Sequence, residues 1–303
     1  MPAGPDPSTS AGRVARGLLR EMRPKQWSKN FLLFFGLIFA LKLTDLRLLG
    51  LATAGFVVFC AASSAIYIVN DLADLDRDRH HPVKRSRPIA SGIVTPTQAM
   101  ALAGVLLVAS IAGSFALRPY FGAVTLAYLA LNVAYSFWLK HVVLIDVFSI
   151  AAGFVIRAVA GAIVVGVPIS PWLYVCTVLA ALFVAMAKRR QEIVLLSTGA
   201  GRHRRILEEY SPELLDQMIT VVTAATVMAY SLYTFSADNL PKNHAMMLTL
   251  PFVLYGIFRY LYIVYMKNGG GSPEDVLLKD APFLANAVLW MATSVAILYV
   301  FRA

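Results

Sequence analysis

Charged residues are scarce in this sequence. They make up 15% of the 303 residues, whereas hydrophobic residues make up 58%; a soluble domain has roughly 25% and 45–50%. The charges that are present cluster between apolar runs and are not spread along them. This pattern excludes an ordinary soluble globular domain and predicts a protein with several membrane-spanning helices.

Cysteine is also rare, and the N-terminal residues have no apolar core of the kind found in secretory signals. The two cysteines, Cys60 and Cys176, each lie inside an apolar run, which argues against a disulfide framework and a thiolate metal site. Residues 1–22 are rich in Pro, Gly, Ser and Arg. We therefore expect residues 1–22 to form a flexible cytoplasmic tail, and residues 23–303 to form one catalytic domain in the membrane.

Basic residues outnumber acidic ones. The 27 Lys and Arg residues against 17 Asp and Glu give a net charge of +10. In a soluble protein this excess would suggest nucleic acid, but in a membrane protein basic cytoplasmic loops explain it. We expect a lipid bilayer as the surrounding partner and no nucleic acid.

Nine apolar runs come near the length of roughly 20 residues that a membrane-spanning helix requires. They cover residues 31–41, 49–69, 97–117, 120–138, 144–166, 171–187, 214–236, 246–266 and 281–301. If successive loops alternate between the two sides, twenty Lys and Arg residues lie on the side of the N-terminus and five on the other. This asymmetry predicts an all-α, nine-helix bundle in the plasma membrane, with its N-terminus in the cytoplasm.

The most charged stretch runs from Asn70 to Asp78 and follows an apolar run directly. On a helix, Asn70, Asp74 and Asp78 fall at i, i+4 and i+8 on one face, with Asp71 beside them. Carboxylates packed this closely repel one another unless a cation lies among them. Hard oxygen ligands in this number suit Mg²⁺ that also holds a phosphate. The spacing therefore predicts a Mg²⁺ and diphosphate site, with a solvated charged helix end as the alternative.

Cations and aromatic residues gather at other helix ends on the same predicted side. Lys25, Lys29 and Asn30 precede the first run, where they either anchor the span at the headgroups or hold a lipid phosphate. The further candidates for substrate contact are Tyr67, Lys84, Arg85, Arg87, Tyr135, Lys140, Asp146, Arg157, Lys188, Arg189 and Arg190. Cytoplasmic placement alone explains some of these charges, but it does not require three cations in a row at residues 188–190.

Two arginines lie inside predicted spans. An arginine at that depth costs a few kcal/mol and normally faces a polar interior. We expect Arg157 to contact a substrate, and Arg259 to snorkel or to pair with a Tyr hydroxyl or a carboxylate.

The motifs together resemble the UbiA superfamily of intramembrane prenyltransferases. The resemblance rests on the stretch from Asn70 to Asp78, on Arg87-Pro88-Ile89, and on Tyr135-Ser136 with the following Lys140 and Asp146. It extends from about residue 23 to the C-terminus. It implies nine spans, an active site facing the cytoplasm, and Mg²⁺ as the cofactor, with Asn70, Asp74 and Asp78 as catalytic residues.

One departure from the family pattern indicates the substrate. Typical members carry a second Asp-rich motif near the end of the sixth span, where this chain has Lys188-Arg189-Arg190-Gln191-Glu192. Cations cannot ligate a metal, but they neutralise phosphate directly. The chain is similar in this respect to one branch of the family, which transfers phosphoribose to decaprenyl phosphate.

The resemblance to this branch implies a phosphoribosyltransferase, which is a pentosyltransferase. Its donor would be 5-phosphoribosyl-1-diphosphate and its acceptor a polyprenyl phosphate, and the product would supply arabinan for the cell wall. The acidic stretch with Mg²⁺ would bind the diphosphate. Residues 188–190, with Arg157 or Lys140, would bind the 5-phosphate, and Lys25, Lys29 and Asn30 would bind the lipid phosphate.

Two alternatives remain at this point. The nearer is a conventional prenyltransferase that moves a prenyl group from a prenyl diphosphate to an aromatic or other acceptor. The farther is a transporter, against which we note that the strong charges lie at one face and not near the midplane. The sequence leaves open the length of the lipid and whether the chain forms a homo-oligomer.

Overall fold

The computed structural model describes residues 7–80, 84–169, 171–197, 206, 209–237, 240–267, 269, 271 and 273–301 of the chain. Within these ranges the fold is all helical, and no strand occurs. Arg202, Arg204 and Arg205, which contribute to the predicted cytoplasmic charge, lie outside the described residues.

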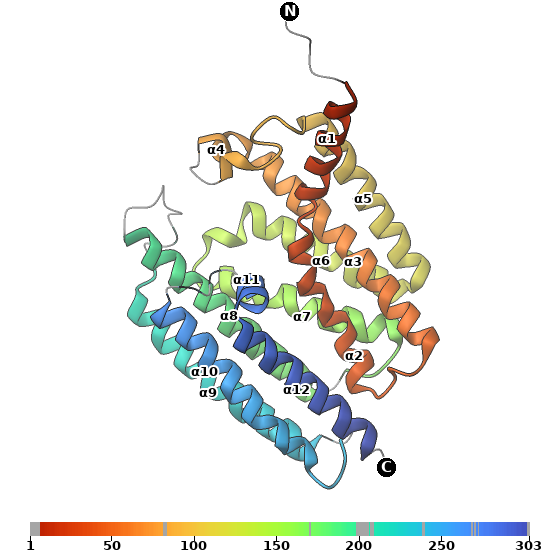
Figure 1. Ribbon diagram of the computed structural model, residues 1–303, viewed down its shortest axis with the longest axis vertical. Helices are drawn as coiled ribbons and strands as arrows, with labels where there is room; N and C mark the ends of the chain where they lie inside the picture. Colours follow the sequence, from red (N-terminus) through yellow and green to blue (C-terminus); the bar gives the residue numbers. More distant parts are fainter. Residues whose placement is uncertain are drawn as a thin grey trace, which may run out of the picture.

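Figure 1 shows how the helices are arranged. The α-helices are α1 (Pro7–Glu21), α2 (Leu33–Phe39), α3 (Leu46–Ala73), α4 (Leu75–His80), α5 (Pro96–Leu117), α6 (Pro119–Phe137), α7 (Ile145–Val165), α8 (Pro171–Ser197), α9 (Pro212–Ser236), α10 (Leu250–Met266), α11 (Pro273–Lys279) and α12 (Ala281–Val300). The 3₁₀ helices are η1 (Pro24–Leu32), η2 (Lys84–Ser86), η3 (Leu139–His141) and η5 (Ala245–Thr249).

A helix occupies each of the nine predicted apolar runs. Of the described helices, seven are long and apolar enough to cross a membrane by themselves: α3, α5, α6, α7, α9, α10 with its leading η5, and α12. The first predicted run is not one long helix, because η1 leads into the seven-residue α2. The protein is a multi-pass membrane protein, and the count of nine spans stays a prediction.

Small residues hold the short helix α2 closely against α7. A Cβ atom added at Gly161 would lie 2.1 Å from the carbonyl oxygen of Leu33, and one added at Gly36 would lie 2.9 Å from Cα of Ala162. Close backbone approach is a main source of helix association in membranes, where apolar burial between helices adds little. This contact fixes α2, and with it η1, against the middle of the bundle.

Residues 7–21 form the helix α1, within the segment for which the sequence predicted a flexible tail. Gly17 and Glu21 are buried on one face of α1, and Val94 and Ile93 lie against Gly17. The composition of the tail suggested disorder. The spacing of Val14, Gly17, Leu18 and Glu21 on one helical face provides the surface through which the helix packs.

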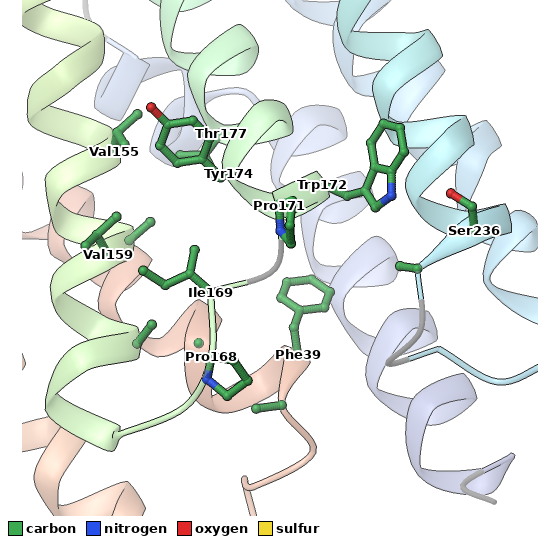
Figure 2. A pocket seen from close by; sticks show the side chains of 15 residues that line it. Phe39, Val155, Val159, Pro168, Ile169, Pro171, Trp172, Tyr174, Thr177 and Ser236 are labelled. Atoms are coloured by element: carbon green, nitrogen blue, oxygen red, sulfur yellow. The ribbon is translucent and has the colours of Figure 1, made fainter.

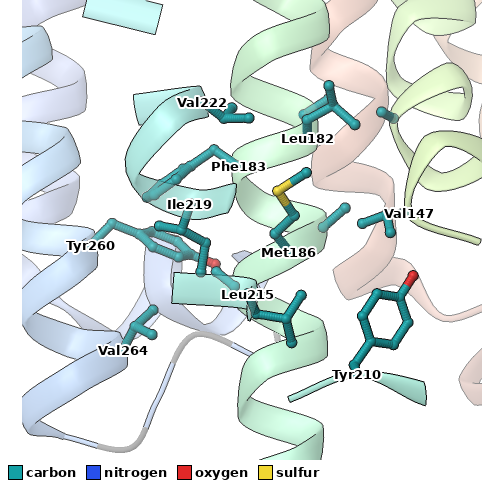
Figure 3. Packing of buried hydrophobic residues seen from close by; sticks show 14 of the residues in the cluster. Val147, Leu182, Phe183, Met186, Tyr210, Leu215, Ile219, Val222, Tyr260 and Val264 are labelled. Atoms are coloured by element: carbon teal, nitrogen blue, oxygen red, sulfur yellow. The ribbon is translucent and has the colours of Figure 1, made fainter. Parts of the chain in front are cut away.

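Helix α7 joins the two halves of the bundle. Its second half packs with α2, α3 and α6 in one buried cluster that includes Leu33, Phe59 and Phe121. Its first half packs with α8, α9 and α10 in a second cluster, in which Val147 faces Met186 and Leu182 (Figure 3). The beginning of α7 therefore lies where the ends of α3, α6 and α8 meet.

Candidate active site

The acidic stretch forms a wall where α3 turns into α4. Asp74 caps α3, and the amide of Asp74 donates to the carbonyl of Asn70 (3.0 Å) while the amide of Asp78 donates to the carbonyl of Asp74 (2.9 Å). The four-residue backbone bonds continue through the junction, so Asn70, Asp74 and Asp78 lie on successive turns, as the spacing predicts. We call residues 70–78 the acidic wall.

Arginines from other elements neutralise the buried carboxylates of this wall. Nη1 of Arg87 lies 2.8 Å from Oδ1 of Asp71 and 2.6 Å from Oδ2 of Asp78. Nη2 of Arg23 contacts both oxygens of Asp71, at 2.5 and 2.7 Å, and Lys84 lies 3.7 Å from Asp78. The sequence predicted a cation among these carboxylates, and here guanidinium groups lie among them.

The donor set of the acidic wall fits Mg²⁺. Among the described residues, no three His, Cys, Asp or Glu side chains are placed together so that they could hold a metal ion. Mg²⁺ beside phosphates does not require such a cluster, because it uses one or two carboxylates together with water and substrate oxygens. The carboxylate of Asp74 is 36% exposed and Asn70 adds an amide oxygen. Asp71 has both oxygens bound to arginine, so it is better suited to holding Arg23 and Arg87.

Glu21 is buried beneath the acidic wall. The sequence did not indicate that this carboxyl group lies there. Its Oε1 accepts a hydrogen bond from the amide of Ile89 (2.8 Å), two residues beyond Arg87. Burial, together with its hydrogen bond with Asp71, raises the pKa of Glu21 to about 7. Glu21 thus connects α1 to the loop that carries Arg87.

The last turn of α6 connects the acidic wall to a group of cations. The hydroxyl of Ser136 donates to Oδ1 of Asn70 (2.7 Å). The neighbouring Tyr135 accepts a long hydrogen bond of 3.5 Å from Nη2 of Arg189 on α8. Lys140 follows in η3 and is half-buried at the same end of the bundle. The ends of α3, α6 and α8 therefore meet in the structure.

Arg189 is the centre of what we call the basic wall, formed by Lys188 and Arg189. Its side chain is 1% exposed, and Nη2 lies 2.7 Å from Oδ2 of Asp146, which is fully buried. Glu192 pairs with the same guanidinium. Lys188 interacts electrostatically with Lys29, Glu192 and Tyr135. These contacts bring the basic wall close to η1, where Lys29 lies.

A strained turn and a tyrosine hold Asp146 in place. Leu144 has φ 66° and ψ −42°, and the amide of Ile145 donates to the carbonyl of Val143 (2.8 Å), which is a γ-turn that non-glycine residues rarely adopt. The hydroxyl of Tyr210 donates to Oδ1 of Asp146 and accepts from the amide of Leu144, both at 2.7 Å. Nothing in the spacing of the sequence indicates this role of Tyr210.

Arg190 faces away from the basic wall. Its guanidinium pairs with Asp216 of α9 (2.5 Å) and stacks on the ring of Tyr265 of α10 at 4.1 Å. Consecutive residues of a helix point about 100° apart, so Arg189 and Arg190 reach different neighbours. The three-residue cluster of the sequence is divided by the helix on which it lies.

Arg259 also pairs with a carboxylate, that of Asp280, at 2.9 Å, in agreement with one of its two expected roles.

Arg157 and Asn30 form a buried network that is separate from the basic wall. Nε of Arg157 donates to Oδ1 of Asn30 (2.9 Å), and its other nitrogens donate to Gly153 O (2.8 Å) and to Tyr128 OH (2.7 Å). Asn30 is completely buried and donates onward to Cys60 and Ser63. In this arrangement the pair positions η1 from within, whereas the sequence predicted direct contact with substrate.

An apolar groove of ≈ 630 Å³ begins at Lys29. It runs between α2, α7, α8, α11 and α12, and Ser28 and Lys29 provide its polar end. Phe31 and Val288, which line the groove, are strongly exposed, so the groove opens on the side of the helix bundle.

Other predicted residues lie near η1 or the acidic wall. Lys25 is exposed, and Tyr67 lies under the guanidinium of Arg23 at 4.9 Å. Arg85 is exposed beside the acidic wall.

Comparison with known sequences relates the chain to one family of proteins. A model of the UbiA prenyltransferase family matches residues 30–272. The chain is 35% identical over 286 residues to the decaprenyl-phosphate phosphoribosyltransferase of Mycobacterium tuberculosis, which covers 92% of this chain and 93% of the relative. It is 34% identical over 297 residues to the enzyme of that name from Mycolicibacterium smegmatis, with 94% and 93% covered.

Solved structures with the same fold include a UbiA homolog from Archaeoglobus fulgidus bound to GPP and Mg²⁺. It superimposes with a TM-score of 0.71 at 21% sequence identity, covering 93% of this chain and 99% of that one. A structure of a digeranylgeranylglyceryl phosphate synthase superimposes with a TM-score of 0.64 at 16% identity and covers 94% and 98%. At these identities the likeness establishes the fold.

Proposed function

The chain belongs to the UbiA prenyltransferase family, and from this premise we propose that it transfers 5-phosphoribose from 5-phosphoribosyl-1-diphosphate to a polyprenyl phosphate such as decaprenyl phosphate. The observation that carries the proposal is the basic wall linked to the acidic wall through Tyr135 and Ser136, because a donor with two separate phosphate groups needs both. The relatives named for this activity, at 34–35% identity over most of the chain, support it.

The acidic wall would bind the diphosphate end of the donor. We assign Asn70, Asp74 and Asp78 as the residues that hold Mg²⁺, consistent with a family fold solved with this ion. When bound, Mg²⁺ supplies positive charge that stabilises the departing diphosphate. Arg87, which is partly exposed, is placed to donate a charge-assisted hydrogen bond to the same group.

The basic wall would bind the 5-phosphate of the ribose. Arg189 is held by Asp146, and a guanidinium with a fixed orientation presents its remaining N–H groups without further ordering. Lys188 adds a second charge near Tyr135, and we assign Tyr135 and the following Lys140 of η3 to the same phosphate. The ribose would then lie between the two walls, beside the last turn of α6.

The lipid acceptor would approach from the groove. Lys29 at the polar end, with the exposed Lys25, would hold the lipid phosphate, and the apolar groove would take the first part of the chain. A phosphate monoester is ionised near neutral pH, so its oxygen needs no general base. This oxygen forms a bond to ribose C1 as the bond from C1 to the diphosphate breaks. Catalysis would come chiefly from positioning two anionic substrates against each other.

We place the site on the cytoplasmic face of the plasma membrane, since the donor is soluble and basic residues concentrate at that end. The product, a polyprenyl-phosphoryl-5-phosphoribose, is a suitable precursor for arabinan in cell-wall arabinogalactan.

A donor-specificity assay tests the proposal. The purified protein in lipid nanodiscs would be incubated with polyprenyl phosphate and radiolabelled 5-phosphoribosyl-1-diphosphate, with and without Mg²⁺. We expect the label to enter the lipid extract only when Mg²⁺ is present. In the matched assay, a labelled prenyl diphosphate is offered with an aromatic acceptor. Transfer only in this second assay would overturn the proposal in favour of a conventional prenyltransferase.

A further inference from the structure

A second cavity lies at the end of the bundle opposite the basic wall. It has a volume of ≈ 300 Å³ and is enclosed by α2, α7, the loop before α8, the start of α8 and the end of α9. In Figure 2, Val155 and Val159 of α7 line one side and Phe39 lies across from them, while the ring of Trp172 lies toward Ser236 at the end of α9. No charged side chain is among the described residues that line it.

This distal cavity adjoins the groove that begins at Lys29, and the two spaces share one lining residue. Thr177 of α8 lines both spaces. Along α8 the groove extends from Val184 to Thr177, and the distal cavity extends from Thr177 to Pro171. At a rise of 1.5 Å per residue, the two together follow α8 for roughly 20 Å. The short helix α2 contributes Phe35 to the groove and Phe39 to the cavity, and α2, α7 and α8 border both spaces.

We propose that the distal cavity receives the far end of the acceptor's polyprenyl chain, which rests on the proposed function. The phosphate would lie at Lys29, the first isoprene units in the groove, and later units beyond Thr177. An occupant without charge is required, because this lining offers a charged or strongly polar group almost no partners. A decaprenyl chain, when extended, exceeds the roughly 30 Å of a bilayer's hydrocarbon core, so it is long enough to reach the cavity.

The cavity would then select for chain length. Each isoprene unit that passes Thr177 exchanges lipid or water contacts for packing against Trp172 and Val159. A chain that ends within the groove gains nothing from the cavity. Filling the distal cavity should therefore penalise long acceptors and spare short ones.

A matched pair of Ala→Phe variants tests this. Ala158 lines the distal cavity and Ala287 lines the groove. For Ala158→Phe we expect kcat/KM to fall roughly tenfold with decaprenyl phosphate and to change less than about twofold with farnesyl phosphate. For Ala287→Phe we expect a loss with both acceptors. An equal loss with both acceptors in Ala158→Phe, or no loss with either, would overturn the inference.

A binding measurement separates this inference from the proposed function. A polyprenyl phosphate with a photoreactive diazirine at its far end would be irradiated with the wild-type protein, and the crosslinked peptides identified. We expect the label on the peptide containing Trp172 and Tyr174, and its displacement by excess decaprenyl phosphate. Equal labelling by a diazirine phospholipid would show an ordinary membrane lipid in the cavity and would overturn the inference. Crosslinking needs no turnover, so failure to transfer phosphoribose would refute only the proposed function.

Discussion

The acidic wall and the basic wall neutralise their charges in different ways. In the acidic wall, Asp71 and Asp78 are buried, but the arginines and lysine that pair with them come from other elements and remain partly exposed. In the basic wall, Arg189 and Asp146 are both buried, and a strained turn and Tyr210 hold the acid. An exposed partner can be exchanged for another cation at little cost, whereas a buried pair is fixed before substrate arrives. The comparison suggests an exchangeable metal-binding wall opposite a preorganised phosphate-binding wall.

We expect the largest effect from substitutions in the acidic wall, where the transfer rate should fall. Asp78→Asn or Asp74→Asn removes a charged oxygen ligand, and we expect the Mg²⁺-dependent rate of phosphoribosyl transfer to fall about 100-fold or more. Steady-state kinetics across a Mg²⁺ titration would measure this. Asp76→Asn is the matched control, since Asp76 lies in the same stretch, is 93% exposed and has its carboxylate 3.6 Å from Arg79. Near wild-type rates in both Asp74 and Asp78 variants would refute the metal assignment.

The next effect concerns the stability of the basic wall. Asp146→Asn removes the negative charge that pairs with the buried guanidinium of Arg189. We therefore expect the free energy of unfolding to fall by about 3–5 kcal/mol. A lower thermal unfolding midpoint in detergent would report it. Asp216→Asn breaks the partly exposed pair with Arg190 and should cost about 1 kcal/mol or less. Similar midpoints for the two variants would mean that burial does not distinguish the two pairs.

A kinetic effect should separate the consecutive cations of α8. Lys188→Gln removes a charge that faces Lys29 and Tyr135, so we expect KM for the phosphoribosyl donor to rise roughly tenfold, with KM for the lipid little changed. Arg190→Gln alters a residue bound to Asp216 and Tyr265 and should leave the donor KM within about twofold. If both variants raised the donor KM equally, the orientation of Arg190 in this structure would not describe the working enzyme.

We expect the smallest effect on the pH dependence of stability, through Glu21 beneath the acidic wall. The pKa of Glu21 rises from 4.5 to about 7 on folding. The folded protein therefore binds this proton more tightly, and the stability it contributes is complete below pH 4.5 and is lost as the pH rises through 7. Glu21→Gln should flatten the decline of the unfolding midpoint between pH 5 and 8 by a few degrees, about 2–4 °C per kcal/mol. An unchanged slope in the variant would contradict this account.

The residues that were predicted well are those whose placement follows from local periodicity. Apolar runs located the helices, because a span must be continuous and hydrophobic. The i, i+4, i+8 spacing correctly placed Asn70, Asp74 and Asp78 on successive turns, because the α-helix has a constant geometry. The ends of α3, α6 and α8 were also expected on one side of the membrane, since basic residues mark that side.

The tertiary structure alone decided which charges pair. Lys188, Arg189 and Arg190 are equivalent in sequence, yet only packing against α7 and α9 turns Arg189 to Asp146 and Arg190 to Asp216. The same holds for Arg87 between two carboxylates and for Asn30 beneath Arg157. These partners are separated by many residues in the chain. Their distances depend on how side chains of several helices fill a shared interior, which no local pattern specifies.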